Sequence, residues 1–156
     1  MSIEKAKEHL RKKGYLDRLI EPEESSATVE LAAEALGCAP AQIAKTLSFL
    51  VGEEAVLILA AGTARIDNRK FKDTFHTKAK MIPFDQVEAL TGYAPGGVCP
   101  FGANEGVHVY LDESLKAYEY VYPAAGNDHS GVRLTVHELE DCADALGWID
   151  VCKEAE

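Results

Sequence analysis

Two adjacent apolar segments near the middle of the chain constrain the fold most strongly. Residues 45–51 (KTLSFLV) and 55–61 (AVLILAA) have the length and composition of buried strands, and Gly52-Glu53-Glu54 joins them. This pattern predicts a hairpin. The strands and helices expected around it follow no βαβ rhythm, and no G-x-G-x-x-G or Walker A motif is present. An α+β fold is therefore predicted, with a mixed or mostly antiparallel sheet flanked by helices.

The other elements are predicted from caps and from the spacing of apolar residues. Thr135 and Glu138 have the spacing of a capping box, which marks the start of a helix. Further helical segments are expected at residues 2–14, 28–36 (capped by Thr28 and ended by Gly37), 40–44, 67–75 (capped by Asp67), 84–91 and 135–146. Further strands are expected at residues 107–111, 118–122, 132–134 and 148–151.

Length and cysteine usage limit the class of protein. With 156 residues, the chain is expected to form one domain over residues 1–156. No apolar run reaches the roughly 18 residues of a membrane span, and the charged start lacks the apolar core of a secretory signal. A cytoplasmic location without membrane attachment is expected. The four cysteines form no C-x-x-C pair, and no histidine has zinc-finger spacing, so neither a metal nor a cofactor is predicted.

The charge of the chain is unevenly distributed. The net charge of −10 argues against a protein that coats nucleic acid indiscriminately. Residues 65–80, however, contain six basic and two acidic side chains, whereas residues 134–156 contain seven acidic side chains and Lys153. The basic segment can contact phosphates, although a solvated helix face explains the same pattern.

The glycine–proline loop, residues 91–102 (TGYAPGGVCPFG), is the clearest candidate for a binding element. It contains four glycines and two prolines and has no amphipathic period. Such a loop can be rigid and can present backbone N–H groups to an anion or a carbonyl group. The alternative is a tight corner between packed elements.

Two further polar side chains are candidates for a binding or catalytic role. Lys45 opens an apolar strand, where its ammonium group can either face a cleft or reach solvent. His129 lies in the sequence Gly126-Asn-Asp-His-Ser130, which is typical of a surface turn, but its imidazole can also transfer protons near neutral pH.

Several of these segments, in their order and spacing, resemble the YbaK/prolyl-tRNA editing-domain family over about residues 25–151. The resemblance is carried by residues 28–37 (TVELAAEALG), Gln42-Ile-Ala-Lys45-Thr-Leu, Ala61-Gly62 with Arg65-Ile-Asp67, the glycine–proline loop, Ala125-Gly126 and Leu134-Thr-x-x-Glu-Leu139.

The resemblance implies a partly barrel-like mixed sheet and an enzyme that hydrolyses mischarged aminoacyl-tRNA in trans, most often Cys- or Ala-tRNA(Pro). The implied partners are the tRNA acceptor end and an aminoacyl-tRNA synthetase; the sequence carries no signal for an oligomeric state. A catalytically silent module that binds aminoacyl-tRNA or a synthetase is the alternative, and a small acylated nucleotide is a further possible substrate. The resemblance implies Lys45 as the key functional residue and requires no protein nucleophile. The implied substrate-binding residues are Thr46, Gly96, Gly97, Val98, Cys99, Pro100, Gly102 and His129.

Overall fold

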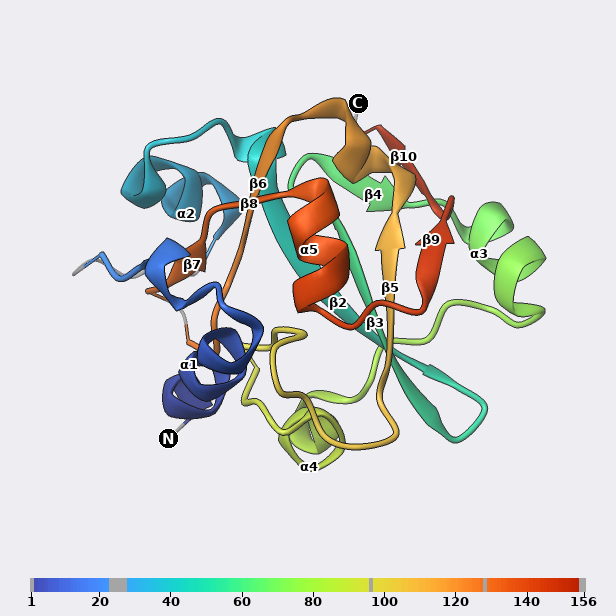
Figure 1. The fold of residues 1–156 in the computed structure, drawn as a ribbon. Coiled ribbons are helices and arrows are strands. Elements are labelled where there is room, and N and C mark those ends of the chain that lie inside the picture. The colour runs from blue at the N-terminus through green and yellow to red at the C-terminus, as the bar shows by residue number, and fades with distance from the viewer. Residues whose placement is uncertain (1, 23–27, 96, 128, 155–156) are drawn as a thin grey trace.

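A six-stranded mixed sheet forms the centre of the computed structural model, which describes residues 2–22, 28–95, 97–127 and 129–154 (Figure 1). The sheet is curled into a half-barrel. Its strands lie in the order β8 (Leu134–Thr135), β6 (Tyr120–Pro123), β2 (Ile43–Val51), β3 (Glu54–Ala61), β5 (His108–Asp112) and β9 (Gly147–Ile149). The predicted α+β class with a mixed, partly barrel-like sheet is confirmed.

The predicted hairpin is the middle of this sheet. β2 and β3 pair antiparallel, with Lys45 opposite Ala60 and Val51 opposite Glu54. β6 runs parallel to β2, and β5 runs parallel to β3, so the hairpin is enclosed by partners distant in sequence. Two small antiparallel sheets complete the strands: β1 (Leu19–Ile20) with β7 (Gly131–Val132), and β4 (Ala64–Ile66) with β10 (Cys152–Glu154).

Five α-helices surround the sheet, and the three predicted helix caps are present. The helices are α1 (Ser2–Lys13), α2 (Val29–Leu36), α3 (Asn68–Phe75), α4 (Val87–Thr91) and α5 (Val136–Cys142). Thr28 accepts a hydrogen bond from the Leu31 amide, Asp67 caps α3, and Thr135 and Glu138 form the capping box of α5. No helix within the described ranges is long and apolar enough to cross a membrane.

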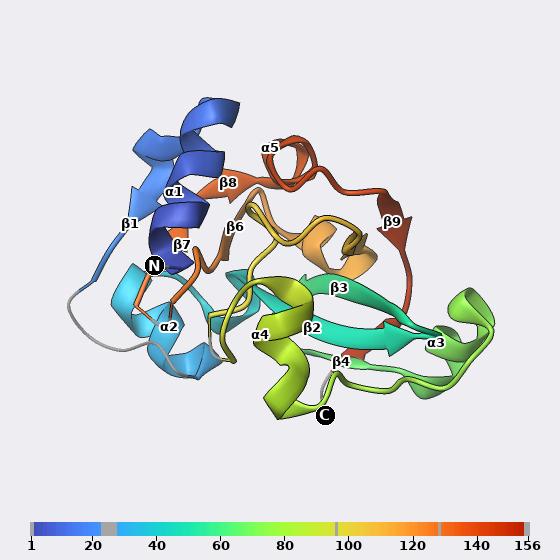
Figure 2. The same cartoon turned by 90° about the horizontal axis from the view of Figure 1, so that it is seen from below.

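The two faces of the sheet are covered by different elements. Leu57 and Leu59 of β3 pack into a core with α1, α5 and the glycine–proline loop. Val56 and Ile58 alternate to the opposite face and pack against Phe71 of α3. Figures 1 and 2 show α2 and α3 at opposite ends of the molecule, with α4 and the glycine–proline loop between them.

Several element boundaries differ from the sequence-based expectation. The helical turn expected at residues 40–44 ends at Gln42, because β2 begins at Ile43. The helix expected from residue 84 begins as a 3-10 turn (Phe84–Gln86), and α5 ends at Cys142 because Asp144 adopts a left-handed conformation with φ of 52°. The strand expected at 132–134 is divided at Arg133, where the chain leaves β1 and joins β6. The strand expected at residues 148–151 ends at Ile149. The sequence did not predict β10, because its pairing partner β4 is distant in the sequence.

Candidate functional site

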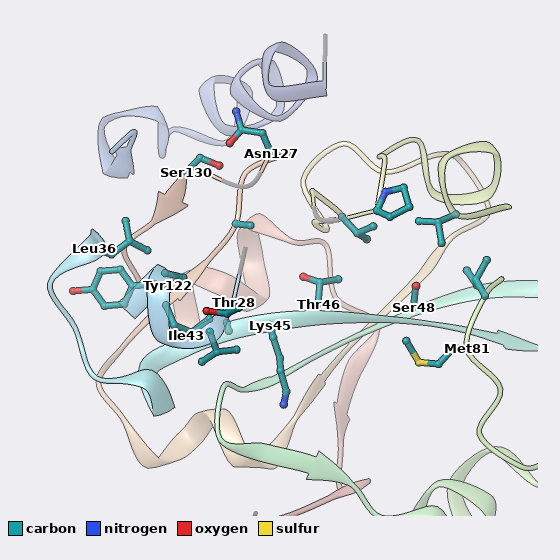
Figure 3. A pocket seen from close by; sticks show the side chains of 18 of the residues that line it. Thr28, Leu36, Ile43, Lys45, Thr46, Ser48, Met81, Tyr122, Asn127 and Ser130 are labelled. Carbon is teal, nitrogen blue, oxygen red and sulfur yellow. The ribbon is translucent and has the colours of Figure 1, made fainter. Parts of the chain in front are cut away.

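A cavity of about 400 Å³ lies between α2 and one face of β2. Its walls come from α2, β2, residues 81–87, the glycine–proline loop and residues 122–130. Figure 3 shows these segments converging from different parts of the chain. The lining residues are Thr28, Val29, Ala32, Leu36, Ile43, Ala44, Lys45, Thr46, Ser48, Met81, Ile82, Phe84, Val87, Pro95, Val98, Tyr122, Ala124, Asn127 and Ser130. A concave, mostly apolar site of this size is suited to a small ligand.

Thr46 places an unpaired hydroxyl group in this cavity. The alternation of β2 directs Thr46 and Ser48 to the same face, toward the glycine–proline loop (Figure 3). Thr46 Oγ1 is buried and has no hydrogen-bond partner among the described residues. Burying such a group costs free energy, so the site is suited to a ligand that supplies the missing hydrogen bond.

Two other hydroxyl groups around the cavity, those of Thr28 and Ser130, have hydrogen-bond partners. Thr28 Oγ1 accepts from the Leu31 amide at 3.1 Å, and Ser130 Oγ accepts from the Ala125 amide at 3.1 Å. These two side chains hold α2 and residues 125–130 in place. Thr46 therefore differs from both, because its hydroxyl has no such structural hydrogen bond.

Lys45 lines the cavity but leaves β2 on the face opposite Thr46 (Figure 3). Its ammonium group donates to the carbonyl oxygens of Gly62, at 3.3 Å, and Ala64. Burial lowers the pKa of the Lys45 ammonium group. An ammonium group has three N–H donors, so these two carbonyl oxygens leave one donor unused.

The glycine–proline loop is braced by its own hydrogen bonds. Thr91 Oγ1 donates to Val87 O at 2.8 Å and accepts from the Tyr93 amide at 3.2 Å. The hydroxyl of the buried Tyr93 donates to Phe101 O. Gly97 N–H donates to Ala94 O at 3.0 Å, so this amide closes a turn and does not face the cavity. These hydrogen bonds brace the described part of the loop.

Gly97 brings the glycine–proline loop against the second polar segment selected from the sequence. A Cβ atom on Gly97 would lie 2.6 Å from Gly126 O and 3.1 Å from Asn127 Cα. Close backbone contact of this kind requires glycine. Pro95 and Val98 of the loop and Asn127 and Ser130 of the turn consequently line the same cavity.

The predicted substrate-binding residues divide into two groups. Thr46 and Val98 line the cavity, as does the predicted catalytic residue Lys45, whose side chain leaves β2 on the opposite face. Cys99 does not line it: the side chain is completely buried in the main core, where burial raises the pKa of the thiol to about 12. The expectation that Cys99 faces the pocket is therefore corrected, because the chain turns its side chain inward.

The remaining predicted residues of the loops also lie away from the lining. Pro100 is buried, and Gly102 faces α1, where a Cβ would lie 3.3 Å from Lys5 O. Gly97 acts through its contact with Gly126, whereas Gly96 lies outside the described residues. His129 is exposed, and its backbone amide donates to Asn127 Oδ1 at 3.0 Å.

The described lining residues lack the side chains that usually act as a general base or as a nucleophilic thiol. The described lining residues carry no carboxylate, imidazole or thiol group. Hydroxyl groups, the Asn127 amide and the Lys45 ammonium group are the polar functions present. Such a lining can bind and polarise a carbonyl group, but it supplies no general base of ordinary pKa among these residues.

Sequence reasoning missed the wall formed by Met81, Ile82, Phe84 and Val87. Ile82 N–H donates to Ser48 O at 3.1 Å, which joins this segment to β2. No local signal identifies such a contact, because it depends on pairing across the sheet. Ser48 could have been found, since its two-residue spacing from Thr46 places both on one strand face.

The basic segment is largely exposed. Lys70 is neutralised by Asp150 at 3.0 Å, whereas Arg65, Arg69, Lys72, Lys78 and Lys80 are exposed. The segment ends directly before Met81, at the edge of the cavity. Within this segment, Lys80 directly precedes the lining residue Met81, whereas Arg69, Lys70 and Lys72 belong to α3 at the other end of the molecule.

Comparison with known proteins gives consistent matches. Residues 23–142 match the family model for the aminoacyl-tRNA editing domain. An uncharacterized protein of Bacillus subtilis strain 168, YwhH, is 45% identical over 157 residues, covering 100% of both chains. A candidate Cys-tRNA(Pro)/Cys-tRNA(Cys) deacylase of Enterococcus faecalis, EbsC, is 32% identical over 106 residues, or 66% of this chain and 64% of that protein. The crystal structure of a candidate trans-editing enzyme for prolyl-tRNA synthetase matches with a TM-score of 0.88 at 31% identity, covering 97% of both chains.

Proposed function

Because the chain belongs to the aminoacyl-tRNA editing domain family, we propose that it is a single free-standing domain that hydrolyses mischarged aminoacyl-tRNA in trans. Cysteine or alanine attached to tRNA(Pro) is the first candidate substrate. The unpaired Thr46 hydroxyl in a cavity of about 400 Å³ is the observation that carries the proposal. A small aminoacyl group fits such a volume and offers the hydrogen bond that Thr46 lacks.

The reaction requires little from the protein beyond positioning and charge stabilisation. Water adds to the ester carbonyl carbon and forms a tetrahedral oxyanion; if the neighbouring ribose hydroxyl adds first, the acyl group only moves to that oxygen, and water must then add to the new ester. The bond to the tRNA oxygen then breaks, the tRNA hydroxyl is regenerated, and the amino acid leaves as a carboxylate once water has supplied its oxygen. The absence of a carboxylate, imidazole or thiol in the described lining agrees with this route.

Lys45 is the proposed catalytic residue. Two of its donors are held by the carbonyl oxygens of Gly62 and Ala64, which fixes the ammonium group on the face of β2 opposite Thr46. The third donor can bind the ester carbonyl or an oxygen of the terminal ribose. A positioned cation of this kind stabilises the oxyanion more strongly than water does, because it requires no reorganisation during the reaction.

The tRNA is proposed to approach along the exposed basic segment, whose side chains can contact acceptor-stem phosphates. The overall charge of −10 weakens such binding. We therefore include delivery by a synthetase in the proposal. The similar crystal structure is that of a candidate trans-editing enzyme for prolyl-tRNA synthetase, which supports this choice.

The test is a deacylation panel with Cys-, Ala-, Ser- and Thr-tRNA(Pro), and with Pro-tRNA(Pro) as the correctly charged control. Lys45→Ala is expected to lower the rate on the preferred substrate by roughly 10²- to 10³-fold, with an unchanged circular dichroism spectrum. Lys116→Ala is the matched control, since Lys116 is exposed and does not line the cavity. A wild-type rate in Lys45→Ala would refute its catalytic role.

A second candidate is a silent module that binds aminoacyl-tRNA or a synthetase. It is favoured by one observation: the Lys45 side chain points away from the cavity face that carries Thr46. The same panel separates the two. Wild-type protein that retains aminoacyl-tRNA or captures prolyl-tRNA synthetase, yet hydrolyses no ester in the panel, would favour the silent module.

A further inference from the structure

Two large apolar side chains are exposed at the edge of the cavity. Phe84 is 80% exposed and Met81 is 53% exposed, and both line the cavity. Among the described residues, Phe84 is the most exposed large hydrophobic side chain. Single exposed apolar residues are common, but two beside a cavity that contains an unpaired hydroxyl indicate a binding surface.

The backbone beneath these side chains is firmly held. Ile82 and Val87, on either side of Phe84, are buried in a common cluster with Ala55. Leu50 N–H donates to Lys80 O at 2.8 Å, and Ile82 N–H donates to Ser48 O at 3.1 Å. Phe84 is thus exposed on an anchored segment, and its ring is presented at little further entropic cost.

The charge beside this surface identifies the kind of partner. Lys78 and Lys80 are exposed, and they lie three residues and one residue before Met81 in the chain. An exposed aromatic ring next to lysines is the arrangement by which proteins bind single-stranded nucleic acid: the ring stacks on a base and the cations contact phosphates.

We propose that Phe84, supported by Met81, stacks on the 3′-terminal nucleobase of the RNA whose aminoacyl ester enters the cavity. The inference rests on the proposed function. A cavity of about 400 Å³ that receives the aminoacyl group leaves the base outside, at the rim where Phe84 lies. Phe84 is therefore a positioning residue: by holding the base, it places the aminoacyl group in the cavity beside Thr46.

The experiment measures binding and does not require turnover. The probe is an uncharged RNA microhelix with a single-stranded CCA end, and binding is measured by fluorescence anisotropy. Phe84→Ala is expected to weaken binding roughly 5- to 100-fold, and Phe84→Trp is expected to retain it. Leu146→Ala is the matched control, because Leu146 is 60% exposed and does not line the cavity.

A second probe with an abasic 3′-terminal nucleotide tests the stacking itself. Wild-type protein should bind it more weakly than the intact probe, and Phe84→Ala should cause no additional loss. Equal binding of the intact probe by wild type and Phe84→Ala would overturn the proposal. So would loss of self-association in Phe84→Ala, measured by sedimentation with RNA binding unchanged, because the surface would then belong to a second copy.

The outcomes also separate this inference from the proposed function. Phe84-dependent binding of the CCA end without deacylation of any substrate would support the stacking surface and refute the hydrolase. Deacylation that proceeds with a normal KM in Phe84→Ala would support the hydrolase and refute the stacking surface. A raised KM with little change in kcat is the result expected if both hold.

Discussion

Gly97 lies directly against the peptide group of Gly126, where a Cβ atom on Gly97 would come within 2.6 Å of the Gly126 carbonyl oxygen. This contact joins the glycine–proline loop to the turn that carries Asn127 and Ser130. Both segments line the cavity, so its shape depends on a backbone approach that a larger residue would prevent.

Gly97→Ala is expected to destabilise the protein and to impair the cavity, because the clash is with backbone and neither loop can easily yield. We expect a loss of about 1–3 kcal/mol in the free energy of unfolding. Gly147→Ala is the control, since a Cβ there meets no atom within 4 Å. Chemical denaturation should distinguish them; a Gly97→Ala variant as stable as Gly147→Ala would contradict the contact.

Thr46→Val should stabilise the fold while impairing the proposed activity. The substitution removes a buried hydroxyl group that has no partner among the described residues and keeps a similar shape, so unfolding should cost about 1 kcal/mol more. Deacylation should fall, because the ligand loses its hydrogen bond.

Ser130→Ala is the opposite case. It leaves the buried Ala125 amide without its acceptor and should reduce stability by about 1–3 kcal/mol. Thermal melts of both variants test the distinction. If Thr46→Val and Ser130→Ala shift the melting temperature in the same direction, the assignment of Thr46 as the unpaired group is wrong.

Because Glu138 forms an ion pair with Arg18, we expect the free energy of unfolding to decrease at acidic pH. Arg18 binds its carboxylate through two contacts of 2.8 Å, and the Thr135 amide donates to the same group, so the pKa of Glu138 is lowered. The pKa of Glu138 in the folded protein lies below the unfolded value of about 4.3. The ion pair therefore stabilises the fold fully at pH values above the unfolded pKa, and this stabilisation is lost as the pH falls through the folded pKa.

Glu138→Gln isolates the charge, because glutamine can still complete the capping box. Near neutral pH the variant should be less stable by up to about 1 kcal/mol, since solvent screens the pair. The difference from wild type should shrink during acidification below the usual glutamate range. Melting curves across acidic pH measure this; a difference that stays constant would show that the ion pair contributes nothing.

The cysteines are expected to differ in reactivity. Burial raises the thiol pKa of Cys99, Cys142 and Cys152 to about 12, whereas Cys38 is only half-buried and its pKa is raised less. Thiolate is the reactive form. Iodoacetamide should therefore modify Cys38 first in the native protein and the others only after unfolding. Mass spectrometry with Cys38→Ser as control checks this, and native labelling of Cys99 would contradict its burial.

The sequence predicted the elements that depend on neighbouring residues. Thr28, Asp67 and the Thr135–Glu138 pair each determine a helix start through hydrogen bonds within one turn. The β2–β3 hairpin is equally local. The family resemblance extended this to the fold and to the aminoacyl-tRNA editing domain family, both confirmed, whereas the roles given to individual site residues stay predictions.

The helix caps and the β2–β3 hairpin could be predicted from the sequence, because short-range sterics and hydrogen bonds fix them. Which side chains share the cavity could be seen only in the folded chain. In the folded chain, the Cys99 side chain lies in the core, and Lys45 and Thr46 lie on opposite faces of β2. Phe84 lies at the rim of the cavity. These placements depend on strand pairing and backbone contacts between residues far apart in the chain, and such contacts leave no pattern in the local sequence.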